Sequence, residues 1–136
     1  MKENKMTNAD ILALAEADPE NATEISAALV KDGRESACNK ASLYATTEFV
    51  TRYLVEELDL DRNEAEDMLY DTEFNSIILD TLKDIVFVFF TALFEGGEEP
   101  TREELIEKLD EHEEFIYDYA YDHDYLQQNN SYSYER

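Results

Sequence analysis

The amino-acid sequence predicts an all-α protein, a compact bundle of about six helices with a central apolar helix and an acidic C-terminal helix. Only three Gly and two Pro occur in 136 residues, whereas a β-sandwich or barrel needs turn residues about every eight to twelve positions. Apolar residues recur at steps of three and four, which is the spacing of one helix face. Capping residues precede several of these segments, as they do at helix N-termini.

The length and composition predict one helical domain over residues 1–126, followed by a disordered tail over residues 127–136. A chain of 136 residues can bury a core without disulfides or metals. It is 43% apolar and contains seven Phe and nine Tyr, too many core-forming residues for intrinsic disorder despite a net charge of -23. The last ten residues are polar and poor in aliphatic side chains, which is typical of a disordered end.

Three helix starts carry a capping box, in which the side chain of the capping residue accepts a hydrogen bond from the amide of the third helical residue. These start at Thr7, Asp61 and Thr101. Asp18-Pro19 should end the first helix, and Gly33 should end the second. The six expected helices cover about residues 7–15, 20–33, 36–58, 61–69, 73–94 and 101–126.

The fifth expected helix, over residues 73–94, is the apolar one. Its apolar face consists of one stripe, formed by Phe74, Ile77, Ile78, Leu82, Ile85, Val86, Phe89 and Leu93. The third expected helix has a similar stripe on one face, formed by Leu43, Thr47, Val50, Leu54 and Leu58. The last ten residues of the fifth expected helix are apolar on nearly all sides, because four more apolar residues lie outside its stripe: Phe87, Val88, Phe90 and Phe94. The segment is therefore either a buried central helix or the seam of a homodimer.

The remaining composition indicates a soluble, cytoplasmic protein. The single Cys38 cannot form an internal disulfide, and no charged segment followed by an apolar one opens the chain. The most apolar stretch, residues 85–94, has ten residues, whereas a membrane span needs about 20.

The charge of -23 predicts the kind of partner. It repels phosphate and anionic lipid, so nucleic acid and membranes are poor ligands and basic, nucleic-acid-binding proteins are good ones. The charge is also uneven. Residues 1–50 hold nine acids and five bases, and residues 51–136 hold 25 acids and six bases, so the second half of the chain carries the excess.

The sixth expected helix separates apolar from acidic residues. Its core face should contain Leu105, Leu109, His112, Phe115, Ile116, Tyr119, Ala120, His123 and Leu126. The opposite half is the predicted partner-binding surface, formed by Glu103, Glu104, Glu107, Asp110, Glu111, Glu114, Tyr117, Asp118, Tyr121, Asp122 and Tyr125, with Glu113 and Asp124 at its margin. On one straight helix these ten carboxylates are spaced roughly 3.3 Å apart along the axis, close to the spacing of about 3.4 Å between phosphates of a DNA strand.

Two details favour a binding role over a merely solvated face. Asp118, Asp122 and Asp124 lie in the last turns, where the helix dipole disfavours anions. Tyr117, Tyr121 and Tyr125 lie among the acids at steps of four, and exposed tyrosines are common in binding hot spots. The alternative for the tyrosines is packing along their own helix or beneath the C-terminal tail.

The sequence offers no catalytic, cofactor-binding or metal-binding residues. Residues 59–63 resemble the start of a calcium loop, but Glu64 replaces the glycine of position six and Tyr70 the acid of position twelve. His112 and His123 lie eleven residues apart on the apolar face, which favours a structural role. Cys38 lies near a helix start without a nearby histidine, so it is interpreted as structural.

Small size, helical pattern, acidic charge and tyrosines among the acids, strongest over residues 56–125, resemble the phage-encoded DNA-mimic proteins that inhibit restriction enzymes or other defence machinery. The resemblance lies in composition and charge layout and assigns no functional residue. It implies a competitor for the DNA-binding groove of an enzyme, often a dimer. The near-neutral residues 1–50 depart from that pattern, which suggests a separate structural or docking role for them.

We therefore predict a non-enzymatic anti-restriction type of inhibitor that binds a basic, nucleic-acid-binding protein and no nucleic acid or membrane directly. The alternative is a helical adaptor or scaffold that acts through an apolar dimer or partner interface at residues 87–94. A third class is a small acidic chaperone for a basic client.

The first testable prediction is that the protein does not bind duplex DNA, because a net charge of -23 opposes association with a polyanion. An electrophoretic mobility-shift assay at moderate ionic strength should show free duplex at all protein concentrations. A basic DNA-binding protein serves as the positive control, and a clear shift by the acidic protein would contradict the prediction.

Overall fold

The computed structural model describes residues 5–123, and this part of the chain is all-α. Its elements are α1 (Asn8–Ala15), α2 (Pro19–Lys31), α3 (Arg34–Leu58), α4 (Arg62–Tyr70), α5 (Thr72–Ile77), α6 (Leu79–Phe90), the π-helical turn η1 (Thr91–Glu95), α7 (Arg102–Asp110) and α8 (Glu113–Asp122). The only strand-like pairing among these residues is one isolated bridge between Lys5 and Thr101. The predicted disordered tail, residues 127–136, lies outside the described residues.

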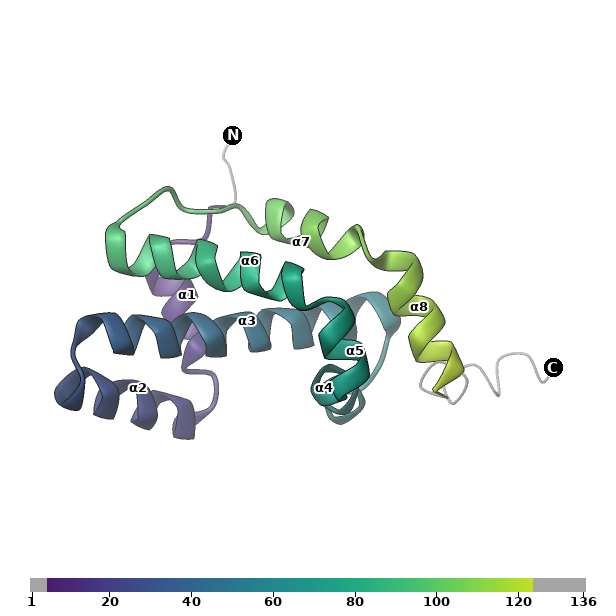
Figure 1. Cartoon of the computed structure of the whole chain (residues 1–136), viewed down its shortest axis with the longest axis horizontal. Helices are drawn as coiled ribbons and strands as arrows, with labels where there is room; N and C mark the ends of the chain where they lie inside the picture. Colours follow the sequence, from purple (N-terminus) through teal and green to yellow (C-terminus); the bar gives the residue numbers. More distant parts are fainter. Residues whose placement is uncertain (1–4, 124–136) are drawn as a thin grey trace.

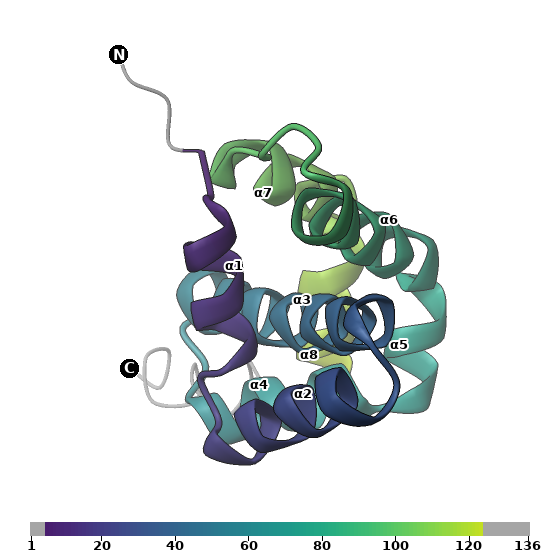
Figure 2. The same cartoon turned by 90° about the vertical axis from the view of Figure 1, so that its left-hand side faces the viewer.

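The central helix is α3, not the apolar fifth helix that the sequence predicts. It contacts α1, α2, α4 and α6; α6 runs alongside it in Figure 1, and α1 lies to its left in Figure 2. Small buried residues, among them Ala37, Ala41 and Ala45, let the surrounding helices approach closely. On its predicted stripe, Val50 and Leu54 are buried, whereas Leu43 is 54% exposed.

The three predicted capping boxes are confirmed. Thr7, Asp61 and Thr101 each accept a hydrogen bond from the amide of the third helical residue, whose carboxylate in turn accepts from the cap amide. Asp18 also caps α2, with Pro19 in the first helical position. Gly33, beyond the end of α2, has a φ of 104°, which a residue with a side chain rarely adopts.

The fifth expected helix is divided into α5, α6 and η1, so the prediction of one continuous helix is wrong. The chain turns at Ile78, which is fully buried. Helix α6 buries Thr81, Ile85 and Phe89 on one side, while the Phe87 side chain is 68% exposed. The helix is therefore not surrounded by others, although its last residues are apolar nearly all round.

Arg34 fixes the end of this segment. Its guanidinium donates to the carbonyl oxygens of Leu93 at 3.3 Å and Phe94 at 2.6 Å, and lies 4.6 Å from the centre of the Phe94 ring. A cation at this position satisfies carbonyl groups that lack partners at a helix C-terminus. The first residue of α3 is thereby joined to the end of η1.

The predicted helix over residues 101–126 is also wrong as a single element, because it is interrupted at residues 111–112 between α7 and α8. Helix α7 packs against α6, whereas the rings of Phe115 and Tyr119 on α8 lie 5.6 and 5.1 Å from that of Phe74 on α5. In Figure 1, α8 turns away from the line of α7 just as α5 turns away from α6. The interruption lets both halves follow the helices that they cover.

The charge sequence at this interruption also disfavours a continuous helix. Asp110 and Glu111 are followed by Glu113 and Glu114, and like charges three or four residues apart destabilise a helix. Starting a new helix places Glu113 and Glu114 in its first turn, where the helix dipole favours acids.

A nearly buried carboxylate joins α3 to α4. The Glu48 side chain is 8% exposed and accepts hydrogen bonds from Arg52 at 2.7 Å and from Arg62 at 2.9 Å. These bonds, foremost that from Arg62, hold the pKa of the Glu48 carboxyl below its usual value against the opposing effect of burial.

The second prediction compares two phenylalanines of the same helix. Phe89 is fully buried and Phe87 is 68% exposed. Replacing Phe89 with Ala should reduce the free energy of unfolding by about 3–5 kcal/mol, whereas Phe87→Ala should change it by less than about 0.5 kcal/mol. Urea denaturation followed by far-UV circular dichroism measures both. Equal effects of the two substitutions would contradict the arrangement of α6.

Candidate functional site

The predicted acidic residues lie at the surface of α7, α8 and the turn between them. The following eight side chains are exposed: Glu103, Glu104, Glu107, Asp110, Glu111, Glu114, Asp118 and Asp122. We call this set the acidic face. Helical periodicity therefore orients these residues correctly, while their role in binding stays a prediction.

The bend between α7 and α8 changes the geometry of the acidic face. The spacing of roughly 3.3 Å assumes one straight helix axis, and residues 111–112 separate two helices of different direction (Figure 1). The comparison with a straight row of phosphates is therefore wrong. The carboxylates follow a bent path instead.

The three predicted tyrosines of this surface differ in their environments. Tyr121 is 54% exposed, as expected of a binding residue. Tyr117 is half-buried, and its hydroxyl donates to the carbonyl oxygen of Glu57 at 2.7 Å, so it packs against the end of α3. Tyr125 lies outside the described residues. Tyr117 thus packs against α3, not along its own helix or beneath the C-terminal tail as the alternative expected, and its side chain anchors α8.

The end of α3 adds to the negative potential beside the acidic face. The Tyr53 hydroxyl donates to an Asp110 carboxylate oxygen at 2.7 Å. Burial raises the pKa of Tyr53, and the hydrogen bond to Asp110 and the charges of Asp110, Glu57 and Glu113 raise it further. The pKa of Tyr117 is raised first by burial and then by the same three carboxylates. Carboxylates from α3, α7 and α8 therefore converge on these two phenols, a contribution of α3 that periodicity cannot reveal.

Much of the acidic face is not neutralised within the described part of the chain. Glu107, Glu111, Glu114 and Asp118 have no lysine or arginine nitrogen of residues 5–123 within ion-pair distance. The arginines instead contact groups elsewhere: Arg52 and Arg62 bind Glu48, Arg34 binds η1, and Arg102 binds Glu56.

The histidines and the cysteine occupy separate places. The His112 Nε2 atom lies 2.7 Å from the Thr81 hydroxyl oxygen, and the His123 ring stacks on Tyr119 with 3.9 Å between centroids. His123 is exposed, so it does not extend the predicted core face. Burial raises the pKa of the Cys38 thiol, opposed by the charge of Arg34, which is the reverse of what an activated thiol needs. Among residues 5–123 no three His, Cys, Asp or Glu side chains are placed to hold a metal ion.

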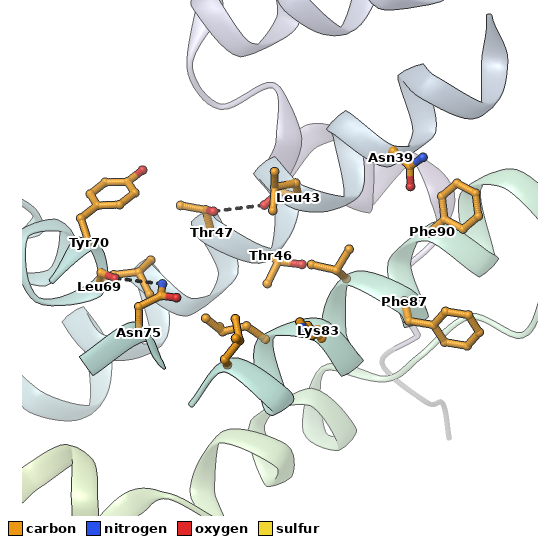
Figure 3. Close-up of a pocket in the computed structure, with 13 residues that line it drawn as sticks. Asn39, Leu43, Thr46, Thr47, Leu69, Tyr70, Asn75, Lys83, Phe87 and Phe90 are labelled. Atoms are coloured by element: carbon orange, nitrogen blue, oxygen red, sulfur yellow. Dashed lines mark hydrogen bonds between the residues drawn. The ribbon is translucent and has the colours of Figure 1, made fainter. Parts of the chain in front are cut away.

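A second surface feature is an apolar groove between α3, α4 and α6, with a volume of about 410 Å³. Figure 3 shows Leu43 on α3, Tyr70 at the end of α4 and Phe87 on α6 around it. Leu43, Tyr70 and Phe87 are each more than half exposed. The off-stripe position of Phe87 signals an exposed apolar residue in the sequence, but nothing there pairs it with Leu43 or Tyr70.

Comparison with protein-family models, characterised proteins and solved structures finds no match to this chain. Within residues 5–123, no helix combines the length and the apolar character that a membrane span requires.

The third prediction concerns the ionisation of Tyr53. Its raised pKa means that the contribution of the protonated phenol to stability is complete below about pH 10, the usual tyrosine pKa, and is lost as pH rises through the raised value. Asp110→Asn removes one charge and should lower the Tyr53 pKa, although burial keeps it above its usual value.

Spectrophotometric titration near 295 nm measures this change, and Tyr53→Phe identifies the transition that belongs to Tyr53. Glu114→Gln is the matched control, because Glu114 is exposed and is not among the charges that shift Tyr53. An unchanged titration in Asp110→Asn would contradict the proposed proximity of the two groups.

Proposed function

We propose that this protein is a non-enzymatic inhibitor that binds a basic, nucleic-acid-binding protein through the acidic face and thereby competes with nucleic acid. The observation that carries the proposal is the exposure of eight carboxylates on α7, α8 and the turn between them. At least Glu107, Glu111, Glu114 and Asp118 have no ion-pair partner in the described chain. A basic groove that binds phosphates would be attracted by the same charge density.

The bend between α7 and α8 is compatible with this proposal. Phosphates of duplex DNA follow a curved path around the helix axis, so a straight row of carboxylates could match them over a short distance only. Carboxylates on two helices of different direction, with Glu57 of α3 beside them, present charge along more than one line. The exposed Tyr121 adds an aromatic side chain that can contact the partner.

The apolar groove supports a second candidate function, that of a helical adaptor. Phe87 is 68% exposed on the segment that the sequence identifies as a potential interface. Ionic strength distinguishes the two functions. Binding through the acidic face should weaken strongly as salt rises, because screening shortens the range of charge attraction to about 10 Å at 0.1 M. Binding through an apolar groove should change little.

The fourth prediction is that Glu107, Glu111, Glu114 and Asp118, when all replaced by Lys, no longer support partner binding. Exposed charges contribute little to stability, so the melting temperature should change by only a few degrees. Affinity for a partner recovered from a host extract at low salt should fall by about two orders of magnitude or more, because attraction becomes repulsion. Isothermal titration calorimetry and thermal denaturation measure the two quantities.

A matched control has the same change in net charge elsewhere on the surface. Glu16, Asp32, Glu95 and Glu98 are exposed and lie outside α7 and α8. Their replacement by Lys should reduce affinity far less than reversal of the acidic face. If the two variants bind equally, net charge alone governs association. If the reversed acidic face binds like wild type, the adaptor function replaces the inhibitor.

A further inference from the structure

We propose that the apolar groove between α3, α4 and α6 is a docking site for an amphipathic helix that carries basic residues, contributed by a partner protein. This proposal does not depend on the acidic face, which lies on α7, α8 and the turn between them. It rests on the exposed apolar side chains around the groove, on the hollow that continues it, and on the charge of the molecule.

Around the groove, apolar side chains remain exposed that a monomer would gain from burying. Leu43 is 54% exposed, Tyr70 67%, Leu79 38% and Phe87 68%. All four line the same groove of about 410 Å³, together with the half-buried Leu82 and other residues (Figure 3). Scattered exposed apolar residues are common on proteins, but a contiguous group around a concavity is typical of a binding site.

The concave shape favours a helix as the occupant. Most of its lining residues come from α3 and α6, and Leu69, Tyr70 and Asn75 of α4 and α5 lie together at one end (Figure 3). An amphipathic helix presents apolar side chains at steps of three and four, and such a ridge fits an elongated apolar groove. The polar lining groups Thr46 and Thr47 are already used, since their hydroxyls donate to backbone carbonyls of α3.

A second hollow continues the groove and is rich in carboxylates. It has a volume of about 380 Å³ and shares Leu43, Thr47 and Tyr70 with the apolar groove. Asp18, Glu48 and Glu66 line it. Arg62 pairs with Glu48 and Glu66, and Arg52 also pairs with Glu48, so the three carboxylates exceed the two cations by one charge. A helix lying in the apolar groove would therefore bring residues at one of its ends close to excess negative charge, which favours Lys or Arg there.

The net charge argues against a second copy of the chain as the occupant. Two copies that dock through this groove bring together molecules of charge -23 each. Lys83 lines the groove, but the exposed Asp80 and Asp84 of the same helix, α6, are close to it in the chain. Repulsion between two such surfaces opposes association. A basic helix gains attraction from the same charge, so the charge selects a partner of opposite sign.

The test uses three synthetic peptides of roughly 18 residues, long enough to form a helix on binding. The first has leucine on one helix face and lysine on the other. The second keeps the leucines and replaces lysine with glutamate. The third keeps the lysines and replaces leucine with serine. Fluorescence anisotropy at 0.15 M NaCl should show that the leucine–lysine peptide binds at least about tenfold more tightly than either of the others.

Groove variants locate the binding site. Leu43→Ser combined with Phe87→Ser should weaken binding of the leucine–lysine peptide by about tenfold or more. Val30→Ser is the matched control, because Val30 is 88% exposed and does not line the groove, and it should leave the affinity within about twofold. Both substituted groove residues are more than half exposed, so circular dichroism should show an intact fold.

Three results would overturn the proposal. Equal binding of the leucine–glutamate peptide would show that charge does not select the occupant. Equal binding of the serine–lysine peptide, unaffected by the groove variants, would assign binding to charge alone and leave the proposed function standing. A dimer in sedimentation velocity that the Leu43→Ser, Phe87→Ser variant dissociates would identify a second copy as the occupant. The variant with the acidic face reversed should still bind the leucine–lysine peptide in the groove, so failure of the proposed function is detected separately.

Discussion

The packing of α1, α2, α4 and α6 around α3 is the constraint on which the rest of the structure depends. Alanines along this helix allow α1, α2 and α6 to pack around it, and Glu48 with its two arginines joins it to α4. Because α6 uses one side of its surface against α3, its remaining apolar residues must find other cover or stay exposed. Phe87 stays exposed. The groove is therefore a consequence of which helix takes the central position.

The sequence predicts where helices begin better than where they bend. The caps at Thr7, Asp61 and Thr101 are local, since each depends on a residue and its neighbours three positions away. No Gly or Pro, the residues that would indicate a helix break in the sequence, occurs at the bends at Ile78 and at residues 111–112. The segment of α5 and α6 bends together with the segment of α7 and α8. The ring contacts between α5 and α8 that accompany these bends depend on the whole fold. For the same reason, the sequence cannot show that α3 displaces the most apolar helix from the centre.

The candidate site shows the same difference between what local patterns predict and what tertiary contacts decide. Periodicity predicts that carboxylates such as Glu107 and Asp118 face outward, because orientation within a helix follows from the apolar residues on its other side. It does not predict that Tyr117 packs against the carbonyl of Glu57, or that Leu43 borders a groove, since both depend on contacts between distant segments. Local patterns thus identify the charge of the surface, while tertiary contacts decide its shape.

The excess of 34 acids over 11 bases makes the surface charge one-sided, and the contacts of the arginines add to this effect. Arg34, Arg52, Arg62 and Arg102 are bound to backbone carbonyls or to carboxylates of the helical scaffold. These four arginines are thus used by the fold, and repulsion among the carboxylates that remain unpaired lowers stability. A charged surface and an apolar groove also affect binding differently. Charge attraction acts at a distance and raises the rate of association, whereas apolar contacts act only after docking and slow dissociation. A protein with both surfaces can therefore attract a basic partner from a distance and still retain it when salt screens the attraction.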